Sequence, residues 1–147
     1  MKKIFLSLVM LYSLVSGALI PYTLENLKKI NLYYIDKSGL FSKKDQELIK
    51  SEIRNKLIKN GFELHADDPS TLVIIIKTIN TDDTLVASIS LLVGEEVITK
   101  REKNIETMAL TFHLNKFIEL DEPTIEIKES INSMLGDFIK LYKEDME

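Results

Sequence analysis

The stretch that decides the fold is "STLVIIIKTIN", residues 70–80. A strand with one solvated face alternates apolar and polar residues, because successive side chains point to opposite faces. Here the apolar residues run without a break from Leu72 to Ile76. The stretch therefore predicts a strand over residues 71–79 with apolar side chains on both faces. It raises the question of what covers the second face.

The segments before this stretch predict a strand and a helix. "INLYYID", residues 30–36, is rich in β-branched and aromatic residues and precedes an Asp-Lys-Ser-Gly turn. Ser42 suits a helix N-cap, and Asp45 three residues later makes a weaker form of the capping box. A helix over residues 43–60 would then end at Gly61. Its apolar residues recur at helical spacing: Leu48, Ile49, Ile53, Leu57 and Ile58.

The segments after it predict a meander and a second helix. "NTDD" forms a hairpin loop, residues 84–93 return as a strand, and "GEE" turns the chain again. "VITKREKNIET" is expected as a long polar strand that continues, with a bulge, into "MALTFHL". There Leu110, Phe112 and Leu114 alternate with polar residues and are expected on one face. Pro123 suits the first turn of the last helix, whose apolar stripe comprises Ile127, Ile131, Met134, Leu135, Phe138, Leu141 and Tyr142.

This order of elements predicts an α+β fold. The expected architecture is a mixed, mainly antiparallel sheet of about four to five strands, with two amphipathic helices on one face. The return strand then has one wholly apolar face that should lie under the helices: Leu85, Ala87, Ile89, Leu91 and Val93. For strand 71–79 the sequence leaves open which parity packs under the helices.

The second face of the sheet is the candidate interaction face. Two helices cover only one face of a sheet well, so some apolar residues should remain accessible on the other. The candidate residues are Val73, Ile75, Val86, Ser88, Ser90 and Leu92. The alternative is that strand curvature closes this face, or that residues 19–29 fold back over it, including Leu19, Ile20, Tyr22 and Leu24.

The N-terminus resembles a secretory signal. Lys2 and Lys3 precede an apolar run over residues 4–15, and Ser16-Gly17-Ala18 is a small-x-small exit. Residues 1–18 are therefore expected to be a cleaved signal peptide, and residues 19–147 a single periplasmic domain without a transmembrane span. The alternative is a retained inner-membrane anchor, although the apolar run is shorter than the roughly 20 residues that span a bilayer.

Composition narrows the classes of function. The chain has no cysteine, so its fold needs no disulfide in an oxidising compartment. The formal net charge is −4, and removal of Lys2 and Lys3 makes it −6. An acidic chain lacks the basic footprint of a nucleic-acid binder. We therefore expect no nucleic-acid partner.

No motif for catalysis, a cofactor or a metal is present. The five glycines are too far apart for a phosphate-binding loop or a dinucleotide fingerprint. A zinc site of cysteine and histidine is excluded, and the spacing of His65 and His113, the two histidines, suggests no other metal site. Adjacent acidic pairs fall in expected turns, where turn chemistry explains them. The sequence thus predicts no enzyme, no cofactor and no metal.

One resemblance of layout adds to these inferences. It is carried by "IRNKLIKNGFELHADDPSTLVIIIKTIN", then "LVASISLLVGEEVITKREKNIET", then an amphipathic C-terminal helix. This layout, over roughly residues 45–142, resembles small bacterial envelope accessory proteins: the auxiliary lipoproteins of lipid-exporting ABC systems and the lipopolysaccharide-assembly lipoprotein class. Those proteins usually begin with a lipidated cysteine, which this chain lacks.

Location, layout and the second sheet face together predict the function. The expectation is a non-catalytic periplasmic accessory or assembly protein that docks to an envelope complex through a protein partner. The alternative is a periplasmic binder of a small apolar or amphipathic ligand, such as a lipid. A concave cavity would favour the ligand, and a flat patch would favour docking.

Overall fold

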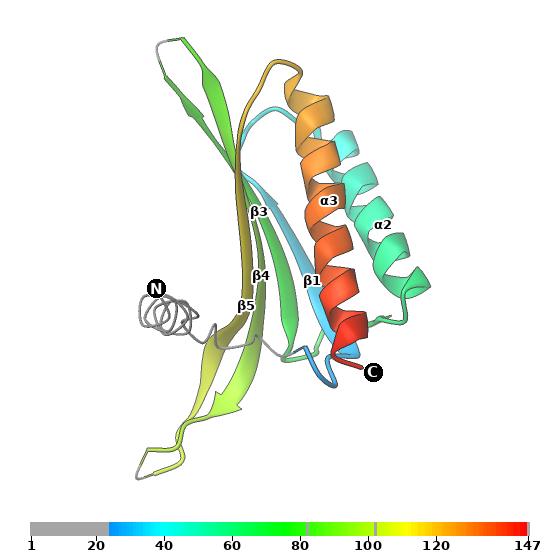
Figure 1. Ribbon diagram of the computed structural model, residues 1–147, viewed down its shortest axis with the longest axis vertical. Coiled ribbons are helices and arrows are strands. Elements are labelled where there is room, and N and C mark those ends of the chain that lie inside the picture. Colours follow the sequence, from blue (N-terminus) through cyan, green and yellow to red (C-terminus); the bar gives the residue numbers. More distant parts are fainter. Residues whose placement is uncertain (1–23, 82, 102, 147) are drawn as a thin grey trace, which may run out of the picture.

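The computed structural model describes residues 24–81, 83–101 and 103–146. Within this part of the chain, five strands form one sheet and two helices pack on one of its faces (Figure 1). The strand order is β2-β1-β3-β4-β5. The predicted α+β fold is confirmed. Residues 1–18, the expected signal peptide, lie outside the described residues.

The first half of the chain forms the parallel part of the sheet. β1 (Lys29–Asp36) pairs in parallel with both β2 (Glu63–Leu64) and β3 (Thr71–Asn80). Parallel neighbours need a crossover, and α2 (Lys43–Lys59) provides it. The predicted cap of α2 is present, because the Asp45 amide donates to Ser42 Oγ at 3.2 Å. Past the helix end, Gly61 has a φ of 97°, which favours glycine.

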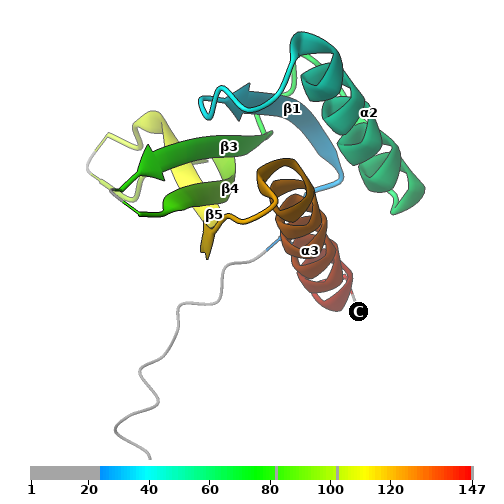
Figure 2. The same cartoon turned by 90° about the horizontal axis from the view of Figure 1, so that it is seen from above.

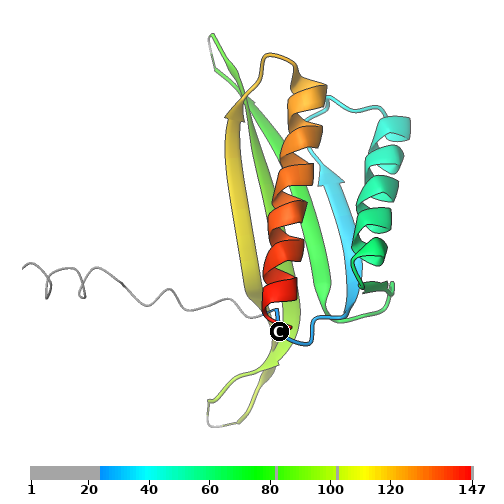
Figure 3. The same ribbon diagram turned by 45° about the vertical axis from the view of Figure 1, so that its right-hand side comes forward.

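The second half forms the antiparallel part. β4 (Leu85–Ile98) pairs with β3 on one side and with β5 (Glu106–Glu119) on the other. α3 (Pro123–Glu144) closes the chain, with proline in its first turn as expected. Figure 2 shows both helices on the same side of the twisted sheet. In Figure 3 the β4–β5 hairpin extends beyond the ends of the helices.

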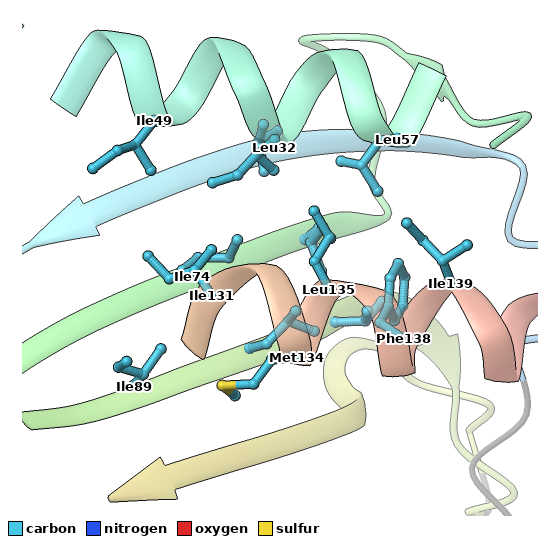
Figure 4. Close-up of a cluster of buried hydrophobic side chains, with 14 of the residues drawn as sticks. Leu32, Ile49, Leu57, Ile74, Ile89, Ile131, Met134, Leu135, Phe138 and Ile139 are labelled. Carbon is cyan, nitrogen blue, oxygen red and sulfur yellow. The ribbon is translucent and has the colours of Figure 1, made fainter. Parts of the chain in front are cut away.

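The core lies between the helices and the face of the sheet that carries the even-numbered side chains of β3. Leu72, Ile74 and Ile76 are at most 1% exposed, which answers the question that the sequence left open. Successive side chains of a strand alternate between its faces, so the odd-numbered side chains of β4 also face the helices. Ile89 is buried among them, as expected. Figure 4 shows Ile74 and Ile89 in one interior with side chains of α2 and α3.

An aromatic cluster anchors α3 to the sheet. The Phe138 ring is fully buried and stacks on Phe62, with ring centroids 5.5 Å apart. Phe112 of β5 meets the same ring edge-on at 5.4 Å. Tyr142 lies one turn further along α3 and also contacts Phe62, at 4.2 Å. The predicted stripe of α3 is therefore core over most of its length.

Some helix residues that shared the helical spacing are not core. Leu48 and Ile58 are 52% and 55% exposed, while the other three apolar residues of the α2 stripe are buried. Leu141 of α3 is 39% exposed. The buried arc of each helix is narrower than its apolar arc, because each contacts the sheet along only one line.

The expected turn at "GEE" is wrong. Residues 94–96 lie inside β4, which continues to Ile98. The turn is instead in residues 99–105, so "VITKREKNIET" is no continuous strand. The Thr99 amide donates to the Ile105 carbonyl at 3.0 Å and closes this loop. A glycine followed by acidic residues resembles turn chemistry, but here Gly94 marks an irregularity within a strand.

That irregularity corrects the expected face of Leu110. Val93 pairs with Phe112, but the next residue, Gly94, pairs with Leu110. Thr111 is therefore an extra residue, a β-bulge, and the alternation of β5 shifts by one. Phe112 is buried at 2% exposure, while Leu110 faces away from the helices and is 55% exposed.

Candidate docking face

The face of the sheet opposite the helices holds all six candidate interaction residues. We call it the outer face. The β3–β4 register pairs Val73 with Leu92 and Ile75 with Ser90. It also pairs Lys77 with Ser88 and Ile79 with Val86. The candidates are thus direct neighbours, and each is partly exposed: Val73, Ile75, Val86, Ser88, Ser90 and Leu92.

The outer face extends over the strands on either side. β1 adds Tyr33 and Ile35, which pair with Val73 and Ile75. β5 adds three exposed apolar side chains, of which Phe117 is the most exposed, at 66%. The others are Met108 and Leu110, and Ile79 and Ile98 complete the apolar set on β3 and β4.

Sequence reasoning missed these flanking residues for two reasons. Tyr33 and Ile35 share a parity in "INLYYID", but which parity faces away from the helices depends on the pairing of β1 with β3. Leu110 and Met108 reach the outer face because of the bulge at Thr111. The only sign of that bulge in the sequence is "GEE", where a glycine and two glutamates interrupt the alternation of apolar residues in the partner strand β4.

The centre of the outer face is uncharged. Three cross-strand rows span β1, β3, β4 and β5, and none of their members is Asp, Glu, Lys or Arg. The rows are Asn31–Thr71–Gly94–Leu110, Tyr33–Val73–Leu92–His113 and Ile35–Ile75–Ser90–Asn115. Charge appears only towards the two ends. Lys77 and Glu119 lie at one end, and Glu96 and Glu106 lie at the other.

A small polar cluster interrupts the apolar surface. Ser90 Oγ donates to Asn115 Oδ1 at 3.0 Å, and Ser88 Oγ donates to the same atom at 3.5 Å. The amide nitrogen of Asn115 makes no protein hydrogen bond in the described part of the chain. The side-chain amide of Asn115 therefore remains open to solvent at the surface.

Described N-terminal residues do not cover the outer face. Leu24 is 1% exposed and belongs to the core on the helix side, contrary to the alternative in which it folds back over the second face. Its amide donates to Asp145 Oδ2 at the end of α3, at 2.6 Å. Leu27 is buried in the same core. Leu19, Ile20 and Tyr22 lie outside the described residues.

Two of the hollows formed by described residues lie away from the outer face. The larger, of about 330 Å³, lies between β5 and α3 and is mostly polar: Lys116, Ile118, Glu119, Glu126, Glu129, Ser130 and Ser133. Glu126 is engaged there as a helix cap, accepting from the amides of Asp121 and Glu122. The other, of about 40 Å³ beside β1 and β2, holds little more than a water molecule. Neither is lined by an apolar residue of the outer face.

The buried hydroxyl of Tyr34 belongs to the helix side. Tyr34 Oη makes no hydrogen bond in the described part of the chain. Burial, followed by the nearby Asp36 carboxylate, raises the pKa of this phenol well above its usual value. Asp36 itself accepts from Ser38 and from Gln46. The hydrogen bonds of Asp36 hold the loop between β1 and α2, and Tyr34 lines neither hollow.

The histidines stand apart from each other. His113 lies exposed on the outer face in β5, and His65 follows β2, with its Nε2 3.8 Å from Glu63 Oε2. Within the described ranges, no group of three or more His, Asp or Glu side chains could hold a metal ion. Nor does any helix described here have the length and apolar character to cross a membrane.

In comparisons with known proteins, neither a family model nor a curated protein matches this chain.

Proposed function

We propose that this chain is a non-catalytic periplasmic accessory or assembly protein that docks to an envelope complex through its outer face. The observation that carries the proposal is the set of apolar side chains on that face, which no described residue covers. Tyr33, Leu110 and Phe117 are each more than half exposed. Contiguous apolar surface of this kind marks an interaction site in a domain that already has a full core.

The composition of the face fits a protein partner. Interfaces between proteins have an apolar centre depleted of charge and a polar rim. The three rows form a centre without charged side chains, in which apolar and uncharged polar residues are mixed, and Lys77 and Glu96 lie beyond it at opposite ends. Aromatic side chains such as Tyr33 and Phe117 are the residue type that most often anchors an interface.

Docking is favoured over the alternative of a small apolar ligand. A ligand of that kind needs a concave, mostly apolar pocket. The larger hollow has only one apolar side chain in its lining, Ile118, and it opens on the helix side of β5. The exposed apolar residues lie on the opposite face of the same strand. The surface available to an apolar partner is thus the sheet itself.

The envelope as the place of action rests on the N-terminal sequence and on the resemblance of layout. Lys2, Lys3 and the small residues of the expected cleavage site, which ends at Ala18, are typical of a signal for export. A protein without cysteine has no lipid anchor on that residue. Docking to a membrane-bound complex would then keep it at its site of action.

The test is capture from native envelope with matched variants. The protein is purified from a periplasmic extract, carrying a photo-crosslinking residue at His113 on the outer face. We expect one crosslinked envelope protein with the wild-type face and its loss in Ser90→Asp. Ser51→Asp, on the exposed side of α2, is the control and should retain the crosslink. Equal capture by both variants would contradict docking through the outer face.

A further inference from the structure

We infer that the hollow between β5 and α3 binds the primary ammonium group of a small molecule, either an amino acid or a simple amine. The hollow has a volume of about 330 Å³. That volume lies at the lower end of the range for small-molecule sites, roughly 300–1,000 Å³. Because α3 lies on the side of the sheet away from the outer face, the inference is separate from docking through that face.

Two elements of regular structure form the walls of this hollow. Lys116 of β5 pairs with Ile89, which is buried under the helices, so the side chain of Lys116 also lies on the helix side. The α3 residues of the lining occupy positions i, i+3, i+4 and i+7, which form one face of a helix: Glu126, Glu129, Ser130 and Ser133. Sites built on helices and strands hold their side chains more precisely than sites on loops.

Ser130 is the first observation that points to a ligand. It is 5% exposed, and among the residues that the structure describes it is the only polar one that is buried. It lines the hollow, yet its hydroxyl makes no hydrogen bond within residues 24–81, 83–101 and 103–146. Serine within a helix can bond a carbonyl of the preceding turn, and a buried hydroxyl without any partner costs free energy. A donor that enters the hollow would supply that partner.

Glu126 provides a carboxylate in a fixed orientation. Its Oε2 accepts from the backbone amides of Asp121 and Glu122, at 2.9 and 3.0 Å. Its other oxygen, Oε1, makes no hydrogen bond in the described part of the chain. Positions i and i+4 are neighbours on a helix surface, so Oε1 of Glu126 and the hydroxyl of Ser130 can accept from one donor group.

The lining carries an excess of negative charge. Glu119 at the end of β5 and Glu129 on α3 add two carboxylates to that of Glu126, against the single ammonium group of Lys116. Lys116 forms no ion pair with any described residue, so it neutralises none of these carboxylates. A site lined by charge of one sign attracts ligands of the opposite sign. The hollow therefore favours a cationic group.

The hydrogen-bond acceptors favour a primary ammonium group over other cations. Such a group has three N–H donors, which match the carboxylate oxygens and the hydroxyl of Ser130. A quaternary ammonium group has no donor and would leave Ser130 without a partner. A metal ion is disfavoured, since no group of three or more His, Asp or Glu side chains in the described ranges could hold one.

The first test is an NMR titration of isotope-labelled protein, purified from a periplasmic extract, with three small probes. Ethylammonium should give saturable shifts of the backbone amides of residues 126–133. Tetramethylammonium, which has the same charge but no donor, should bind about tenfold more weakly. Propionate, a small anion, should give no saturable shift. Equal binding of the two cations, or no saturable shift with ethylammonium, would overturn the inference.

Free alanine distinguishes the two sources of the ammonium group. Its carboxylate can pair with Lys116 while its ammonium group lies against α3. Tighter binding of alanine than of ethylammonium, with the difference lost in Lys116→Met, would identify the ligand as an amino acid. Weaker binding of alanine, with ethylammonium bound more tightly by Lys116→Met, would identify it as a simple amine. Either result supports the ammonium site.

The last test removes single groups from the α3 wall. Ser130→Ala deletes the hydroxyl and should weaken ethylammonium binding about tenfold, and Glu129→Gln should weaken it by removing a negative charge. Ser51→Ala and Glu52→Gln, at exposed positions of α2, are the matched controls and should bind like the wild type. Thermal unfolding confirms that each variant is folded. If Ser130→Ala and Glu129→Gln both bind ethylammonium as tightly as the wild type, this hollow is not the site and the inference fails.

Discussion

Leu110 and Phe112 are two residues apart in β5, yet they point to opposite faces of the sheet. Regular alternation would put them on one face. The bulge at Thr111 separates them, so that Phe112 is 2% exposed under α3 and Leu110 is 55% exposed on the outer face. This one extra residue adds Leu110 to the outer face and removes it from the core.

The bulge can be tested with a matched pair of charge substitutions. Phe112→Asp places an unpaired charge in the core and should prevent folding, because such a charge costs several kcal/mol. Leu110→Asp should fold, since its side chain already contacts water. Circular dichroism and the yield of folded protein are the measurements. Failure of both variants to fold would show that Leu110 is core and that β5 alternates regularly.

Phe138 should be the most sensitive position of α3. Phe138→Ala removes a fully buried ring that contacts Phe62 and Phe112, and it should lower the free energy of unfolding by about 3–5 kcal/mol. Leu141→Ala, three residues on and 39% exposed, should lower it by less than about 1 kcal/mol. Urea denaturation measures both. Equal losses would contradict the packing of α3.

Neighbouring residues of β4 should respond oppositely to the same substitution. Ile89→Asp buries a charge under the helices and should give degraded or insoluble protein. Ser90→Asp faces out beside Asn115 and should fold with a thermal midpoint near that of the wild type. Expression and thermal unfolding separate the two. If Ser90→Asp also fails to fold, the outer face is sealed within the monomer.

The capping box of α2 should be visible in a pH titration. The hydrogen bond from Ser42 lowers the pKa of the Asp45 carboxyl below its ordinary value. A carboxyl with a depressed pKa in the folded state stabilises the fold above its unfolded pKa. That contribution disappears as the pH falls through the lowered value.

Ser42→Ala should therefore raise the pKa of Asp45 towards its ordinary value, as measured by NMR of the side-chain carboxyl. Ser51→Ala, in the interior of the same helix, is the control and should leave the titration unchanged. An Asp45 that titrates at its ordinary pKa in the wild-type protein would show that the cap does not form.

Export should leave a new N-terminus at Leu19. The small residues Ser16, Gly17 and Ala18 predict cleavage after Ala18. Intact-mass measurement of protein from a periplasmic extract should match residues 19–147. A full-length chain found only in the inner membrane would instead identify the N-terminal segment as a retained anchor.

Local patterns predicted the elements whose signals are local. Ser42 marks the start of α2 through its side chain, and Gly61 marks the end through its backbone conformation. Both signals depend only on a few neighbouring residues. The alternation that placed Ile89 in the core is equally local. The architecture of the sheet followed from such elements and from the order in which they occur.

The features that sequence reasoning missed depend on pairing between distant strands. Tyr33 joins the outer face only because β1 lies beside β3, and no pattern within "INLYYID" specifies that neighbour. The misplaced turn at Gly94 has the same origin, since a bulge is defined by the partner strand. The residues that β3 and β4 contribute to the outer face were therefore predicted, but those that β1 and β5 contribute were not.

The hydrogen bond from the Leu24 amide to Asp145 closes the domain on itself. It joins two residues that are 121 positions apart, so the first described residue is held by the residue that caps the C-terminal end of α3. Because the ribosome makes Leu24 long before Asp145, this clasp can form only after nearly the whole chain has emerged. A nascent chain therefore stays open at this end until its last helix has emerged, and the hydrogen bond can contribute to stability only in the complete domain.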